Sequence, residues 1–135
     1  MLGLLADVNA EGHVYVLLKV CESDAWRDVW TSLYVRLFYV EELGLPRNIN
    51  DVDLWRFCQE RSLILITGNR NDKGPVSLQA AIRRFGDPNS LPVLTIADPE
   101  RIFRDRDYAI RSAESLMEIL IDIDDKRGAG RLWLP

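Results

Sequence analysis

Residues 63–72 read Leu63-Ile64-Leu65-Ile66-Thr67-Gly68-Asn69-Arg70-Asn71-Asp72. The first four side chains are apolar, which is typical of a strand that is buried on both faces of a parallel sheet. The polar residues behind them then form a loop at the carboxyl end of that strand. The segment Leu2 to Ala6 ends in the same way, in Asp7-Val8-Asn9. Because open parallel sheets bind ligands at the carboxyl ends of their strands, we expect a functional site where these two strands end.

Short apolar runs alternate with stretches of helical spacing along the whole chain. We predict strands at residues 2–6, 35–40, 63–66 and 91–97, separated by helices that include 10–22, 50–61, one that starts at 74–75 and one long helix over 98–123. This alternation predicts an α/β fold, a three-layer α/β/α sandwich around a mostly parallel sheet of four to five strands. We expect one domain over residues 1–127 and a separate C-terminal tail at 128–135.

Composition narrows the range of functions. The chain has 135 residues, enough for one domain, and its net charge of -4 argues against a general coat for nucleic acid. Cys21 and Cys58 lie in helix-like stretches without the spacing of a metal site, so we expect buried free thiols. No segment is apolar enough to span a bilayer, and no signal peptide is visible at the N-terminus. We therefore expect a cytoplasmic protein with no membrane partner.

The predicted carboxyl edge of the sheet collects acids and amides. It carries Asp7, Asn9, Glu41, Glu42, Asp51, Asp53, Thr67, Asn69, Asn71, Asp72 and Asp98. Neither a glycine-rich phosphate loop nor a Ser or Cys partner for the lone His13 is present. Oxygen ligands without His or Cys suit a hard cation such as Mg²⁺ or Mn²⁺. Such an ion activates a bound water and clamps the oxygens of a phosphodiester.

Three pieces of the chain, taken in order, resemble the PIN-like superfamily, in particular its small members that open with a strand and Asp-x-Asn. They are Leu4-Leu5-Ala6-Asp7-Val8-Asn9; Glu42-Leu43-Gly44-Leu45 with a helix that opens at Asp51 and ends in Cys58-Gln59-Glu60-Arg61; and Leu63-Ile64-Leu65-Ile66-Thr67-Gly68-Asn69. The resemblance runs from Leu2 to about Ile82. It implies a three-layer α/β/α fold and, as in many members, including toxins of toxin–antitoxin pairs, Mg²⁺-dependent ribonuclease activity.

The resemblance also implies roles for individual residues. Asp7 takes the place of the first metal-binding Asp, and Asp51 takes that of the acidic residue at a helix start. Thr67 matches the threonine that orients the site. Asn69 stands where the family usually has its last acidic residue. The implied catalytic set is therefore Asp7, Asp51, Thr67 and Asn69.

Two positions of the loop depart from the family pattern. Asn69 and Asn71 replace acids, and an amide oxygen can ligate a cation but brings no negative charge. Asp72, one position further on, is a substitute ligand, so the implied metal set is Asp7, Asp51 and Asp72. If active, the protein would hydrolyse RNA with metal-activated water, with an activity that the amides reduce.

Other interpretations of the same residues stay open. An inactive PIN-like module that binds RNA, a protein partner or a second copy of itself also fits the amides, and a phosphohydrolase for small nucleotides is a third alternative. Asp51 could equally stabilise a helix N-terminus, and residues 69–72 could be an ordinary polar turn.

Overall fold

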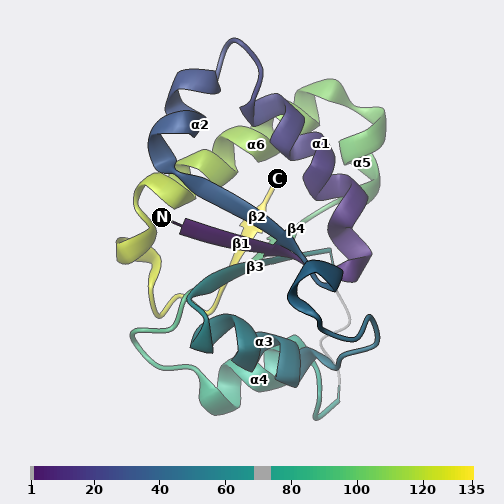
Figure 1. Cartoon of the computed structure of the whole chain (residues 1–135), viewed down its shortest axis with the longest axis vertical. Helices are drawn as coiled ribbons and strands as arrows, with labels where there is room; N and C mark the ends of the chain where they lie inside the picture. The colour runs from purple at the N-terminus through teal and green to yellow at the C-terminus, as the bar shows by residue number, and fades with distance from the viewer. Residues whose placement is uncertain (1, 69–73) are drawn as a thin grey trace.

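The computed structural model describes residues 2–68 and 74–135, and these contain one sheet of five parallel strands (Figure 1). The strands are β1 (Leu2–Ala6), β2 (Val35–Tyr39), β3 (Leu63–Thr67), β4 (Val93–Ile96) and β5 (Arg131–Leu134). Their order across the sheet is β2-β1-β3-β4-β5. The predicted α/β fold with a parallel sheet is confirmed.

Helices cover both faces of the sheet, as the three-layer prediction required (Figure 1). One layer holds α1 (Glu11–Cys21), α2 (Arg27–Leu33), α5 (Pro99–Arg104) and α6 (Arg106–Ile121), and the other holds α3 (Asp51–Glu60) and α4 (Leu78–Phe85). Short 3-10 turns follow β1, β2 and α6, at Val8–Ala10, Glu41–Leu43 and Ile123–Lys126. Within the described ranges, no helix has the length and the apolar character needed to cross a membrane.

Alternation along the strands divides the core between the two layers. Leu4 and Ile64 pack with the α1 and α6 layer, whereas Leu5 and Leu65 pack with α3 and α4. Successive side chains of a strand point to opposite faces, so a continuous apolar run fills both halves of the core. All four side chains are at most 2 % exposed.

Two predicted helices have different bounds in the structure. The long helix over 98–123 is broken at Asp105, whose backbone is extended and whose carboxylate accepts a hydrogen bond from the Tyr108 N–H at 3.1 Å. Asp105 thus caps α6, and its capping bond competes with continuation of α5. The helix predicted to start at 74–75 begins at Leu78, where the Ser77 hydroxyl accepts from the Ala80 N–H at 3.1 Å.

The last residues belong to the sheet. β5 pairs with β4 in register from Val93 and Arg131 to Ile96 and Leu134, and the Ala97 N–H donates to the Leu134 carbonyl at 2.9 Å. The prediction of a separate tail at 128–135 is therefore wrong. The segment is the edge strand, and its Leu134 side chain is fully buried.

Gln59 joins α3 to the chain that enters β4. Its side-chain amide donates to the Leu91 carbonyl at 2.9 Å and accepts from the Leu91 N–H at 3.0 Å. The two bonds satisfy both backbone groups of a residue that is only 5 % exposed. The Gln59 side chain therefore makes, two residues before β4 begins, the backbone hydrogen bonds that a neighbouring strand would otherwise make.

Gln59→Ala should lower the free energy of unfolding by about 1–3 kcal/mol, because it leaves two backbone groups of Leu91 without partners. Urea denaturation followed by circular dichroism measures the change. Glu60→Ala, at the exposed next position of the same helix, is the matched control and should change stability by less than about 0.5 kcal/mol. Equal losses in the two variants would show that the Leu91 contacts contribute nothing.

Candidate functional site

The strand order reverses direction between β1 and β3. In the order β2-β1-β3-β4-β5 the chain leaves β1 toward one edge and β3 toward the other, and such a reversal opens a crevice at the carboxyl ends of the two strands. Asp7 directly follows β1, and Thr67 is the last residue of β3. The Asp7 N–H donates to the Ile66 carbonyl at 2.9 Å, which holds the two strand ends together.

The Asp7 carboxylate is the centre of a hydrogen-bonded cluster. One oxygen, Oδ2, accepts from the Thr67 hydroxyl at 2.9 Å, and Oδ1 accepts from the Val8 N–H at 2.7 Å. The Asn9 side-chain oxygen lies 3.3 Å from the Thr67 hydroxyl and accepts from the Gly68 N–H, also at 3.3 Å. Asp7, Asn9 and Thr67 therefore lock the loops after β1 and β3 to each other, as the two polar strand ends predicted.

Burial disfavours the ionised form of the Asp7 carboxyl. The Asp7 side chain is only 9 % exposed, and its removal from water raises the pKa of the carboxyl above the usual 3.8. Hydrogen bonds from Thr67 and Val8 oppose this rise in pKa, and the negative charge of Glu11 adds to it. A carboxyl group with a perturbed pKa at the ends of these strands is a candidate functional group, since a bound cation would favour its ionised form.

Asp51 reaches the same edge of the sheet from α3. Asn50 caps this helix by accepting from the Asp53 N–H at 2.9 Å, so Asp51 is the first helical residue. Asp51, Leu54 and Cys58 lie three and four residues apart and share one stripe of the helix. Leu54 and Cys58 are buried against the sheet, and Asp51 is half-buried at the end of that stripe. The helix therefore turns Asp51 toward the sheet, whereas Asp53 is exposed.

Cys58 lies on the same stripe of α3 as Asp51 and is buried against the sheet. Burial raises the pKa of its thiol to about 12, and the negative charge of Asp7 adds to the shift. Burial, with a smaller effect of Glu22, also raises the pKa of Cys21 to about 12. The prediction of two buried free thiols is confirmed.

Both thiols should resist modification in the folded protein. The thiolate is the reactive form, and a pKa of about 12 leaves almost none of it near neutral pH. We expect the native protein to leave a disulfide reagent such as dithionitrobenzoate unreacted, and the denatured protein to react at both cysteines. Rapid reaction of either thiol under native conditions would contradict the burial of Cys21 and Cys58.

The remaining predicted site residues have different fates. Asn69, Asn71 and Asp72 lie outside the described residues. Glu41 pairs with Arg47 at 3.0 Å, and the Glu42 carboxylate accepts from the Tyr39 N–H at 2.8 Å. Both glutamates are exposed, which agrees with solvated side chains rather than ligands.

The donor chemistry at Asp7 suits a hard cation, because the Asp7 and Asn9 side chains both present oxygens. Among the residues that the structure describes, no three His, Cys, Asp or Glu side chains form a group that could hold a metal ion. A Mg²⁺ site here would therefore need amide or backbone oxygens, or ligands from residues 69–73, in addition to the carboxylates of Asp7 and Asp51.

Two residues at or near the Asp7 cluster, Asn9 and Cys58, have no role assigned from the sequence. The sequence predicts Asn9 at the carboxyl edge of the sheet but does not predict its hydrogen bond with the Gly68 N–H. The Asp-x-Asn spacing is the signal that could have indicated this bond. The proximity of Cys58 to Asp7 has no sequence signal, since it depends on how α3 packs on the sheet.

The chain was compared with family models, curated proteins and solved structures. No family model, no curated protein and no solved structure matches the chain. A functional assignment therefore depends on the geometry of Asp7 and its neighbours.

Proposed function

We propose that this chain is a metal-dependent ribonuclease of PIN-like type that hydrolyses phosphodiester bonds with metal-activated water. The observation that supports the proposal is the buried Asp7 carboxylate, held by Thr67 at the point where the strand order reverses. Asp51 opens α3 at the same edge and supplies a second carboxylate. Oxygen donors at the carboxyl ends of parallel strands are the setting in which a hard cation and a phosphodiester meet.

Each residue has a defined task in this proposal. Asp7 and Asp51 hold Mg²⁺ or Mn²⁺, with Asp72 or Asn69 as a further ligand, and the Thr67 hydroxyl fixes the orientation of the Asp7 carboxylate. The bound cation lowers the pKa of a water and neutralises charge on the phosphodiester. Because burial raises the pKa of Asp7, metal binding competes with a proton and should strengthen as the pH rises.

Cleavage of a mixed-sequence RNA with Mg²⁺ or Mn²⁺ tests the proposal. We expect Asp7→Asn to lower the rate by about 100-fold or more, because it removes a charge from the metal site. Asp53→Asn is the matched control, since Asp53 is exposed two residues from Asp51, and it should retain the activity. Equal cleavage by the wild type and Asp7→Asn would assign the activity to a contaminant or to another site.

A binding module without catalysis is the second candidate. It is supported by the observation that protein donors already engage both oxygens of Asp7. Such a module would bind RNA, a protein partner or a second copy of the chain. Calorimetric titration with Mn²⁺ separates the candidates, because binding that Asp7→Asn abolishes supports the nuclease and an absence of binding supports the module.

A further inference from the structure

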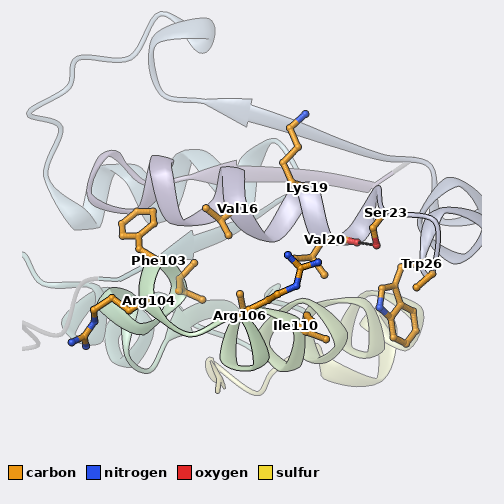
Figure 2. Close-up of a pocket in the computed structure, with 12 residues that line it drawn as sticks. Val16, Lys19, Val20, Ser23, Trp26, Phe103, Arg104, Arg106 and Ile110 are labelled. Atoms are coloured by element: carbon orange, nitrogen blue, oxygen red, sulfur yellow. Dashed lines mark hydrogen bonds between the residues drawn. The ribbon is translucent and has the colours of Figure 1, made fainter.

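A groove runs between α1 and the α5–α6 pair, and none of the residues of the Asp7 cluster lines it (Figure 2). Its volume is about 500 Å³, within the range of sites that bind small molecules. Phe103, in its wall, stacks on His13 with 4.5 Å between the ring centroids, and 55 % of the residue stays exposed. The apolar walls consist mainly of Val16, Val20, Trp26, Ile102, Phe103 and Ile110.

The charged residues that line this groove are all basic. Lys19, Arg104 and Arg106 line it, and no lining residue is acidic, although the chain as a whole has a net charge of -4. Lys19 points away from the groove and pairs with Glu22 at 3.7 Å (Figure 2). Arg106 instead extends across the groove toward Val20. Among the described residues, the Arg106 guanidinium has no hydrogen-bond or ion-pair partner.

The position of Arg106 in its helix adds to the positive potential. Arg106 is the first residue of the 16-residue α6, and a helix N-terminus carries a partial positive charge. The neighbouring cap, Asp105, is already paired with Arg101 at 2.8 Å, so its negative charge is compensated. An anion beside Arg106 would therefore meet a free guanidinium and the start of a helix, between apolar walls.

We propose that this groove binds a small amphipathic carboxylic acid. The carboxylate accepts hydrogen bonds from the Arg106 guanidinium, whose planar fork matches two carboxylate oxygens. The alkyl or aryl body packs on the walls on either side of Arg106, toward Phe103 and Val16 or toward Trp26 and Ile110. This assignment is independent of the proposed nuclease, because the two sites share no residue.

Calorimetric titration with octanoate and octanamide tests the assignment, since the two probes have the same alkyl chain and differ in charge. We expect octanoate to bind with a dissociation constant on the order of 1 mM or below, and octanamide to bind at least about tenfold more weakly. In Arg106→Gln the affinity for octanoate should fall to that for octanamide. Arg111→Gln is the matched control, because Arg111 is exposed on the same helix but lies over Tyr108, outside the groove.

The location is checked by NMR, in which octanoate should shift the methyl resonances of Val16, Val20 and Ile110. Equal affinities for octanoate and octanamide, unchanged binding by Arg106→Gln, or no binding at a concentration on the order of 10 mM would each overturn the proposal. A dimer in sedimentation whose contact protects these methyl groups would also overturn it, and would assign the groove to a second copy of the chain.

Discussion

Asp7→Asn should raise the free energy of unfolding at pH 7 by about 0.5–2 kcal/mol, in the same variant that loses the proposed activity. Asparagine has nearly the same shape as aspartate but carries no charge, so its burial avoids the desolvation of a carboxylate. Its side-chain oxygen can still accept from the Val8 N–H, and its amide can donate to the Thr67 hydroxyl. A residue that destabilises the fold at neutral pH is expected where function requires a charge.

The pH dependence gives the sign of this effect. Because the pKa of Asp7 is higher in the folded protein than the usual 3.8, the folded state binds more protons than the unfolded state above about that pH. The contribution of Asp7 to stability is therefore greatest at low pH and is lost as the pH rises through its folded pKa. The advantage of Asp7→Asn should be absent near pH 3 and should grow to a plateau at higher pH.

Thermal unfolding of the two proteins from about pH 3 to pH 7, with a chelator present, measures this difference. Asp53→Asn is the control of opposite sign, because Asp53 is an exposed carboxylate in the first turn of α3 that accepts from the Asn50 amide at 3.0 Å. Its replacement should cost about 0.3–1 kcal/mol at neutral pH. If Asp7→Asn were destabilising at every pH, the Asp7 carboxylate would be a structural hydrogen-bond acceptor instead of a strained functional group.

The sequence was sufficient for the fold class and for the edge of the sheet at which Asp7 and Thr67 lie. The apolar run from Leu63 to Ile66 indicates a strand covered on both sides, and a parallel sheet places its end at the same edge as the end of β1. That β1 and β3 are direct neighbours is a finding of the structure, because parallel direction alone does not fix the strand order. The sequence places Asp7 and Thr67 at one edge of the sheet, and the structure adds that they are hydrogen-bonded neighbours. The effect of the Asp7 charge on the pKa of Cys58 was not predictable, because no local pattern specifies how closely a helix packs on a sheet.

The errors arose where a local pattern had two solutions. The apolar spacing continues across Asp105, so the sequence favours one helix. The hydrogen bond from the Tyr108 N–H to the Asp105 carboxylate instead caps α6 and separates it from α5. The four residues of β5 are too few to show strand periodicity, and glycines at 128 and 130 resemble the start of a loose tail. Pairing with β4, a contact over more than thirty residues, makes this segment a strand.

Leu134→Ala should lower the free energy of unfolding by about 2–5 kcal/mol, a large part of the stability of a domain of this size. The Leu134 side chain is fully buried and packs with the core of the α1 and α6 layer. Its loss leaves a cavity beside Ile96, its neighbour in the register of β4. A residue of a loose tail would show no such effect, so the variant tests whether β5 belongs to the core.

Trp133→Ala is the matched control, because Trp133 is the preceding residue of the same strand, lies on its opposite face and is 51 % exposed. Although tryptophan is the larger side chain, its removal should cost clearly less than the removal of Leu134, since alternation along β5 buries only one of the two. Urea denaturation ranks the variants, and hydrogen exchange at the Ala97 amide, which donates to Leu134, reports the pairing directly. Equal losses of stability together with rapid exchange at Ala97 would return this segment to a tail and would leave β4 as the edge of the sheet.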